Sequence, residues 1–431
     1  MKIFWYFCSM KKMLAIALMV HAFCVAFSQI ATDSIWNDEI KSVFLTRSDI
    51  EMERPIIRMG APGDDTEQLM LRFDILWPQP HDLRYRIRHC TYDWQIDDLT
   101  PGEFISGREE GLIENYQFSF NTRVEYVNYY QPIPDAYSRF LASGNYLLEV
   151  FPNDHPDSIL ITRRFCVVED LTAIEATVSK PSGGYGNIHR DQEVAVGISP
   201  RSGSYLPMQS DYYSVVLQQN RRTDLYRTLP FDSFSGSMMM YRWKSANVFP
   251  GGNCFRYFDL SNMWAAMYHV QRIEQWGGEN FAFLQPEEDR SGKVYTQYSS
   301  LNGGMKINIR DHNNPQIEAD YVWVNFSLPM ERPFLNGSIH IVGDLTQWRL
   351  DDASRMEWNK EYKAYTKRML LKQGYYAYEL LFLPTGETEG LTATLEGDHY
   401  MTANSYTIYV YLRMPSARYD RLVGLKEIMS Y

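Results

Sequence analysis

The residues that could do chemistry in this sequence form no recognisable reactive cluster. His89 and Cys90 are adjacent, and successive side chains of a strand point to opposite faces, so the two cannot readily bind one metal ion. We therefore expect a packed histidine and a buried thiol. Gly236 lies in Ser-Phe-Ser-Gly-Ser, which lacks the G-x-S-x-G frame of a hydrolase nucleophile elbow.

Acidic pairs and a glycine-rich segment are the remaining candidates. The pairs are sequence neighbours in expected loops: Asp64-Asp65, Glu109-Glu110, Glu287-Glu288 and Asp351-Asp352. A glycosidase needs two carboxyl groups at a set distance in space, so we interpret these pairs as solvated charges. A phosphate-binding loop needs a strand before its glycines and a helix after them, but the segment 182–186 precedes a predicted strand. The sequence thus predicts no catalytic residue, no cofactor and no metal site, and we expect a protein that is not an enzyme.

The N-terminus predicts export. Two lysines precede an apolar run, 13–27, and Ala26-Phe27-Ser28 has the small-x-small pattern of a signal-peptide cleavage site. The run is shorter than the roughly 20 apolar residues that a membrane-spanning helix needs. We expect residues 1–28 to be a signal peptide, with translation starting at either Met1 or Met10.

Charge and cysteine content limit the partners. Removing residues 1–28 takes away three lysines and no acid, which changes the net charge from −11 to −14. Such an acidic chain is poorly suited to nucleic acid or an anionic membrane surface. No direct lipid anchor is expected, because Phe23 precedes Cys24 where a lipidated cysteine needs a small residue. Three cysteines remain: Cys90, Cys166 and Cys254. Their odd number and wide spacing allow one bridge at most, and we expect buried thiols.

Alternating apolar residues predict strands throughout. The segment 371–382 is apolar or aromatic on both faces, which is typical of a central strand covered by a second sheet, and Gly374 provides a turn or bulge near its start. The runs 69–75 and 83–90 flank a proline-rich turn and predict an antiparallel pair with one solvated face. Three arginines line that face: Arg84, Arg86 and Arg88.

Further strands are expected at 146–151, 161–168, 193–198, 213–218, 254–260, 321–328 and 404–412. The segment 36–45 is either a helix or a strand, 262–269 is a candidate short helix, and Asn336-Gly337 predicts a hairpin. The fold class that follows is all-β, built from tandem antiparallel β-sandwiches. We expect four segments: the signal peptide 1–28, an N-terminal β-sandwich 29–172, a second β-rich domain 173–314 and a C-terminal immunoglobulin-like sandwich 315–431.

Six phrases, taken in order, resemble one family. They are His89-Cys-Thr-Tyr-Asp-Trp94, Ser119-Phe-Asn-Thr122, Ser143-Gly-Asn-Tyr146, Gly251-Gly-Asn-Cys-Phe-Arg256, Asp320-Tyr-Val-Trp-Val-Asn-Phe326 and Leu371-Lys-Gln-Gly-Tyr-Tyr-Ala-Tyr378. Together they resemble the plug protein of the type IX secretion system. The resemblance implies a non-enzymatic periplasmic protein, peripheral to the outer membrane, that binds the translocon barrel and occludes its periplasmic opening. It also implies that turns and core positions are defined by His89, Cys90, Trp94, Asn121, Tyr146, Arg256, Gly374 and Tyr376.

The C-terminal segment suggests an alternative. Residues 342–348, together with the tyrosine-rich strand, resemble the early-set immunoglobulin-like domains used as glycogen-binding modules. Trp348 and Trp358 could stack on sugar rings, which would make the chain a periplasmic glycan-binding protein. In the opposing interpretation, Trp348 packs under its own loop.

Overall fold

The computed structural model describes residues 30–47, 52–60, 67–298, 301–310 and 313–430. The expected signal peptide and its cleavage site lie outside the described residues. Strands dominate this part of the chain, and its α-helices are two single turns, α2 (Pro101–Phe104) and α3 (Pro315–Glu318). The all-β class is therefore confirmed. Among the described residues, no helix has the length and apolar character needed to cross a bilayer.

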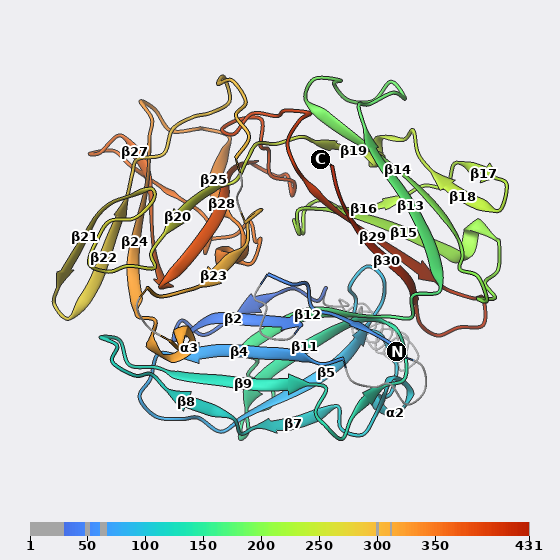
Figure 1. Ribbon diagram of the computed structural model, residues 1–431, viewed down its shortest axis with the longest axis horizontal. Helices are drawn as coiled ribbons and strands as arrows, with labels where there is room; N and C mark the ends of the chain where they lie inside the picture. The colour runs from blue at the N-terminus through green and yellow to red at the C-terminus, as the bar shows by residue number, and fades with distance from the viewer. Residues whose placement is uncertain (1–29, 48–51, 61–66, 299–300, 311–312, 431) are drawn as a thin grey trace, which may run out of the picture.

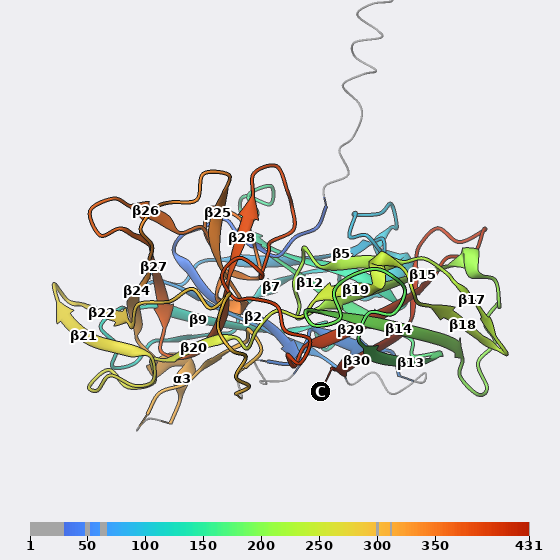
Figure 2. The same ribbon diagram turned by 90° about the horizontal axis from the view of Figure 1, so that it is seen from above.

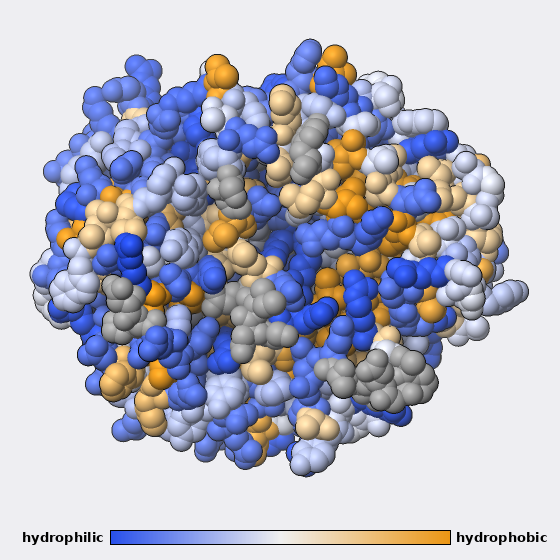
Figure 3. Space-filling model, viewed as in Figure 1, coloured by the Kyte–Doolittle hydropathy of each residue, from blue (hydrophilic) through white to orange (hydrophobic). Residues whose placement is uncertain are grey.

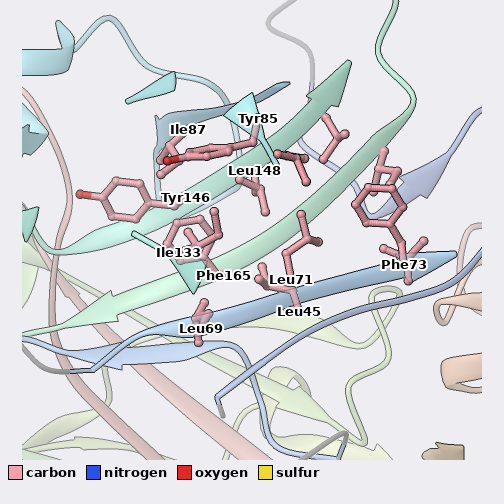
Figure 4. Packing of buried hydrophobic residues seen from close by; sticks show 14 of the residues in the cluster. Leu45, Leu69, Leu71, Phe73, Tyr85, Ile87, Ile133, Tyr146, Leu148 and Phe165 are labelled. Carbon is pink, nitrogen blue, oxygen red and sulfur yellow. The ribbon is translucent and has the colours of Figure 1, made fainter. Parts of the chain in front are cut away.

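The N-terminal sandwich consists of two sheets that enclose one core. The first has the order β1-β12-β11-β5-β7 with β3 beside β12, and the second has the order β2-β4-β9-β8. The strands of the first sheet are β1 (Ser34–Ile35), β3 (Ile56–Arg58), β5 (Leu83–Cys90), β7 (Glu110–Ile113), β11 (Gly144–Pro152) and β12 (Ile161–Val168); those of the second are β2 (Ile40–Arg47), β4 (Leu69–Ile75), β8 (Tyr116–Phe118) and β9 (Val127–Ile133). A two-stranded ribbon, β6 (Ile105–Ser106) with β10 (Arg139–Phe140), lies beside them. Figure 4 shows Leu71 and Phe73 of β4 packed in the core with Tyr85 of β5.

The expected pairing of 69–75 with 83–90 is wrong. These runs form β4 and β5, which belong to different sheets, and the proline-rich turn leads from one sheet to the other. Their apolar residues face each other across the core instead of lying side by side. Periodicity gives the face that each strand buries, but not its neighbour in a sheet. Arg86 and Arg88 both lie within ion-pairing distance of Glu149 on β11, at 2.7 and 3.2 Å.

A second sandwich combines two distant parts of the chain, and we call it the split sandwich. One sheet has the order β13-β14-β18-β17 with β19 beside β14; the other has the order β16-β15-β29-β30. The strands are β13 (Thr172–Ser179), β14 (Asp191–Pro200), β17 (Ser233–Ser235), β18 (Met238–Tyr241) and β19 (Val248–Pro250), facing β15 (Tyr213–Gln219), β16 (Tyr226–Leu229), β29 (Ser405–Leu412) and β30 (Arg421–Met429). Their core includes Val196, Leu217 and Ile408.

The third unit, the inserted sandwich, is formed by the chain between those two parts. One sheet has the order β21-β22-β24-β27-β26, and the other places β28 beside β20, β23 and β25. The strands are β20 (Arg256–Asp259), β21 (Val270–Trp276), β22 (Glu279–Leu284), β23 (Met305–Ile307), β24 (Tyr321–Pro329), β25 (Gly337–Val342), β26 (Glu357–Asn359), β27 (Ala364–Lys372) and β28 (Gly374–Pro384). The central strand expected at 371–382 is β28, which starts at Gly374, while Leu371 belongs to β27.

The sheets do not follow the expected division into 173–314 and 315–431. Strands β20 to β23 precede residue 315 but pack with β24 to β28. Strands β29 and β30 leave the expected C-terminal sandwich: β29 pairs with β15, and β30 pairs with β29. The reason is that β15 pairs along one edge with β29, which is far away in the sequence. The alternation of apolar and polar residues shows which face of a strand is buried, but not which strand lies beside it.

Three shorter expectations also have outcomes in the structure. The segment 36–45 includes the start of a strand, β2, and 262–269 contains no helix. Asn336-Gly337 makes no hairpin between β24 and β25, because β24 pairs with β27 whereas β25 pairs with β28.

The three sandwiches surround a common centre. Figure 1 shows the N-terminal sandwich below, the inserted sandwich at upper left and the split sandwich at upper right. Seen from above, the inserted and split sandwiches lie side by side in a broad, flat body (Figure 2). Each sandwich therefore borders the other two, and the junctions between them decide whether the body is rigid.

Candidate functional site

The structure does not bring the sequence-predicted residues into one site. His89, Cys90, Trp94 and Tyr146 belong to the N-terminal sandwich, whereas Arg256, Gly374 and Tyr376 belong to the inserted sandwich. Within the described part of the chain, no group of three or more His, Cys, Asp or Glu residues could hold a metal ion. The clusters that do form lie inside the sandwiches and at their junctions.

His89 is a packed core residue. Its Nδ1 lies 2.5 Å from Oδ2 of Asp97, and its Nε2 lies 3.2 Å from the carbonyl oxygen of Ser143. The ring stands edge-on to Tyr146, with 4.8 Å between ring centroids. Gly144 is required here, since its φ is +141° and a Cβ would lie 2.5 Å from the His89 Nε2. This signature therefore fixes the entry of β11 into the core.

Cys90 and Trp94 lie in the junction between the N-terminal and split sandwiches. They share a buried cluster with Tyr409 and Tyr411 of β29. Arg164 stacks over the Trp94 ring at 4.7 Å from its centroid, and the backbone of Trp94 is left-handed, with a φ of +67°. Aromatic packing thus closes this junction.

The cysteines of this junction do not form a disulfide. Cys90 and Cys166 pair with the same residue, Asn145, from opposite sides of β11. Two strand spacings, about 9–10 Å, separate them, beyond the roughly 7 Å limit between Cα atoms for a bridge. All three described cysteines are buried and free. Burial raises the pKa of the Cys166 thiol to about 12, so this thiol is not a nucleophile at neutral pH.

A buried ion pair closes the junction between the N-terminal and inserted sandwiches. Nζ of Lys372 on β27 lies 2.6 Å from Oδ2 of Asp74 on β4, and the side chains are 1% and 0% exposed. The same Asp74 accepts hydrogen bonds from Tyr321 and Asn128, each at 2.7 Å. Lys372 also lies over the ring of Tyr126, 4.2 Å from its centroid. Each charge is thus paired and hydrogen-bonded, which a buried ion requires.

The junction between the split and inserted sandwiches contains a third charged cluster. Arg222 is buried and donates to both carboxylate oxygens of Asp224, at 3.1 and 2.5 Å, and to the carbonyl oxygen of Gly390 at 2.6 Å. Glu379 of β28 lies 3.8 Å from the same guanidinium, and its Oε1 makes no hydrogen bond. Burial raises the pKa of Glu379 to about 7 because it outweighs the attraction of Arg222.

Arg256 organises the interior of the inserted sandwich. Its guanidinium donates to Glu287 at 2.5 Å and to Glu396 at 2.9 Å. Burial favours a raised pKa for Glu287, but the hydrogen bond from His269 and the charge of Arg256 outweigh it and lower the pKa to about 2. Neighbouring donors occupy both carboxylates, so we interpret this network as one that stabilises the fold.

The other signature residues stabilise turns or pack in the core. A Cβ on Gly374 would lie 2.3 Å from the carbonyl oxygen of Lys306, so only glycine fits there. Tyr376 stacks on Phe258, with centroids 5.2 Å apart. Asn121 adopts a left-handed conformation, with a φ of +59°, in the turn after β8.

The tryptophans considered for sugar binding are packed inside the inserted sandwich. Trp348 is 5% exposed, its Nε1 donates to Oδ1 of Asp344 at 2.6 Å, and its ring lies edge-on to Phe255. Trp358 is half-buried against Tyr365, with centroids 5.2 Å apart. Trp348 therefore presents no ring face on which a sugar could stack, as the packed interpretation predicts.

One exposed surface combines aromatic side chains with an open strand edge, and we call it the aromatic edge. It consists of Tyr116 and Phe118 on β8, Phe120 just after β8, and Trp276 at the end of β21. All four side chains are more than 40% exposed. Arg123 joins the two segments by donating to Gln275 Oε1 at 2.9 Å. Strand β8 is the last of its sheet, so its outer backbone groups have no strand neighbour among the described residues.

Sequence reasoning missed the charged residues of the junctions. Asp74 and Lys372 are 298 positions apart, and each sits in an ordinary alternating strand. At Glu379 there was a signal, because this charged residue lies on a strand face that the pattern marks as buried. Asp74 lies with Arg72 on the face that the pattern marks as polar, so its burial gave no signal. A buried charged residue needs a partner for an ion pair or a hydrogen bond, but the sequence does not show which residue that partner is.

Comparisons with known proteins give the family. Residues 40–169 match the family described as the type 9 secretion system plug protein, first domain. A crystal structure of a hypothetical protein from Parabacteroides merdae ATCC 43184 is 31% identical in sequence, covers 93% of this chain and all of that one, and superposes with a TM-score of 0.88. No curated protein matches the sequence. The chain belongs to the type IX secretion system plug protein family.

Proposed function

We propose that the chain is a periplasmic plug that binds the outer-membrane translocon barrel of the type IX secretion system and occludes its periplasmic opening. The observation that carries the proposal is the family match over 40–169, which associates the chain with this secretion machinery. A pore wide enough for folded proteins leaks unless it is blocked. Blocking requires bulk and shape, not chemistry, so the proposed role is non-catalytic.

The junctions support this role because they make one body from three sandwiches. Buried charges hold the inserted sandwich to both of its neighbours. Lys372 pairs with Asp74 of the N-terminal sandwich, and Arg222 of the split sandwich donates to the carbonyl oxygen of Gly390 and lies 3.8 Å from Glu379. Buried, hydrogen-bonded pairs are costly to break, since an unpaired charge would be left in the interior. A flat body of this kind resists deformation when it is pressed against an opening.

The aromatic edge is the surface that we assign to the translocon. An open strand edge offers unpaired backbone donors and acceptors, which suit a partner built of strands, and exposed aromatic side chains are typical anchors of interfaces. Tyr116, Phe118 and Phe120 lie within the family match, which favours a role shared by the family. We therefore expect the translocon barrel as the occupant of this edge.

Affinity capture tests the proposal. The mature chain with a C-terminal tag is expressed in its own host and recovered from detergent-solubilised outer membranes, with an unrelated tagged periplasmic protein as the control. The proposal predicts that the translocon barrel is enriched with the tagged chain only. Absence of the barrel under cross-linked and uncross-linked conditions would refute it. No specific observation favours the glycan-binding alternative.

A further inference from the structure

A cavity of about 170 Å³ lies where the three sandwiches meet. Its walls come from all of them: Phe44 on β2, Arg163 on β12, Tyr409 on β29 and Met305 on β23. Figure 3 shows this face of the molecule hollowed near its centre. The volume greatly exceeds the roughly 10–15 Å³ that one buried water needs, so the cavity has room for a small organic molecule.

Arg54 brings an incompletely satisfied charge to this cavity. Its side chain is 9% exposed, and its Nε lies 3.5 Å from Oε1 of Glu427. Nη1 donates to Gln218 at 3.2 Å and to Tyr409 at 3.5 Å, whereas Nε and Nη2 are buried and make no hydrogen bond. A buried guanidinium with idle donors is costly, and an added anion would relieve that cost.

Arg163 brings a second buried charge that faces no close acid. It donates to the backbone carbonyl oxygens of Thr162 at 2.8 Å, Val43 at 3.3 Å and Ser34 at 3.4 Å. Burial lowers the pKa of Arg163 to about 10, which shows that its surroundings do not fully compensate the charge. Within the described residues, no acid lies within ion-pairing distance of this guanidinium.

The remaining acids of the wall are already engaged. Asp33 lies 3.6 Å from Nε of Arg164 and accepts from its backbone N–H, and Asp344 lies 3.3 Å from Arg221. Glu53, also in the wall, lies 4.0 Å from Nε of Arg47. The described wall thus contains one arginine with idle donors, Arg54, and a second, Arg163, whose charge has no acid within ion-pairing distance. Between them lie apolar surfaces from Phe44 and Met305.

We propose that this cavity binds a small anionic molecule with an apolar part. Its carboxylate or phosphate group would accept hydrogen bonds from the idle Nε and Nη2 of Arg54, and the positive charge of Arg163 in the same wall would add to the attraction. Its apolar part would pack on Phe44 and Met305. Because the walls come from three sandwiches, such a ligand would stabilise their junction. The inference is independent of the proposed docking on the translocon.

Calorimetric titration and thermal unfolding of the purified mature chain test this site. The probes are inorganic phosphate, hexanoate and hexyl phosphate, each at constant ionic strength adjusted with sodium chloride. We expect hexyl phosphate or hexanoate to bind with 1:1 stoichiometry, at least tenfold more tightly than inorganic phosphate. The unfolding temperature should rise with the logarithm of the ligand concentration above the dissociation constant. Binding of hexanoate alone would identify a carboxylate ligand, and binding of hexyl phosphate alone a phosphate ligand.

Variants separate the site from general anion effects. Arg54→Met and Arg163→Met should each weaken binding at least tenfold, and Arg54→Lys provides a variant that keeps the charge but loses the forked geometry. Arg355→Met is the control, because Arg355 is exposed and paired with Glu357 at 3.1 Å. Absence of saturable binding by all three probes would overturn the proposal. So would unchanged binding in a folded Arg54→Met protein.

Discussion

The Nζ of Lys372 and the Oδ2 of Asp74 lie 2.6 Å apart, across the junction between the inserted and N-terminal sandwiches. Neither side chain reaches solvent, and Tyr321 and Asn128 complete the hydrogen bonding of the carboxylate. The same junction is also bridged by hydrogen bonds from the backbone N–H groups of Arg123 and Val124 to Asp320, so the buried pair is one part of a larger contact. A rigid plug requires such junctions between its sandwiches.

Removing the lysine should loosen this junction. We expect Lys372→Met to lower the free energy of unfolding by roughly 3–5 kcal/mol, because Asp74 is left as a buried charge without its cation. Urea unfolding followed by tryptophan fluorescence measures the change. Lys363→Met is the control, since Lys363 is exposed and its ion pair with Glu331 should contribute about 1 kcal/mol or less. Equal stability of the two variants would show that the junction is not held in this way.

Glu379 should make the stability depend on pH. Its pKa in the folded chain is about 7, above its ordinary value of 4.5, so the folded state holds this proton more tightly than the unfolded state. The contribution of this proton to the free energy of unfolding is fully present below about pH 4.5 and is lost as the pH rises through about 7. Glu379→Gln has no carboxyl group that must ionise at this position, so it avoids the loss. We expect its free energy of unfolding to exceed that of the parent by about 2–3 kcal/mol at pH 8 and by almost nothing at pH 4.5.

Thermal unfolding of the Glu379→Gln variant across this pH range measures the effect. Glu361→Gln, which changes an exposed acid of the same sandwich, should leave the pH profile of the parent unchanged. A parallel shift of the Glu379→Gln curve at every pH would contradict the assigned ionisation.

The sequence predicted strands and buried faces better than it predicted neighbours. The alternation around β4, β5, β12 and β28 gave the correct elements, because each strand buries one or both faces in a sandwich. The return of β29 to β15 could not be predicted, since the two strands are far apart in the chain and many strands have similar patterns. Arg256 was singled out through a family phrase, yet its partners Glu287 and Glu396 read as ordinary acids. Burial alone distinguishes them.

Trp348 should contribute to stability and not to sugar binding. Trp348→Ala removes a buried ring and its hydrogen bond to Asp344, and we expect a loss of about 3–5 kcal/mol. Trp264→Ala, at a highly exposed position, should have almost no effect. Thermal unfolding of both variants gives the comparison. A stable Trp348→Ala protein that has lost binding on a glycan array would support the glycan-binding alternative instead.

The aromatic edge should decide docking without affecting folding. We expect the double variant Phe118→Ser/Phe120→Ser to reduce capture of the translocon at least tenfold, because exposed aromatic anchors dominate interface energies. Its unfolding temperature should match that of the parent within a few degrees, since both rings are more than half exposed. Tyr205→Ser, on the split sandwich, is the control. Full capture by the double variant would place the docking surface elsewhere.

Outer-membrane permeability tests the plug proposal most directly. Uptake of a large hydrophilic antibiotic is measured in the parent strain, in a strain lacking this chain, and in a strain lacking both the chain and the translocon barrel. The account predicts a leaky membrane in the single deletion only, with the barrier restored by the parent chain and not by Phe118→Ser/Phe120→Ser. Unchanged uptake after deletion of the chain, in cells that still assemble the translocon, would contradict it.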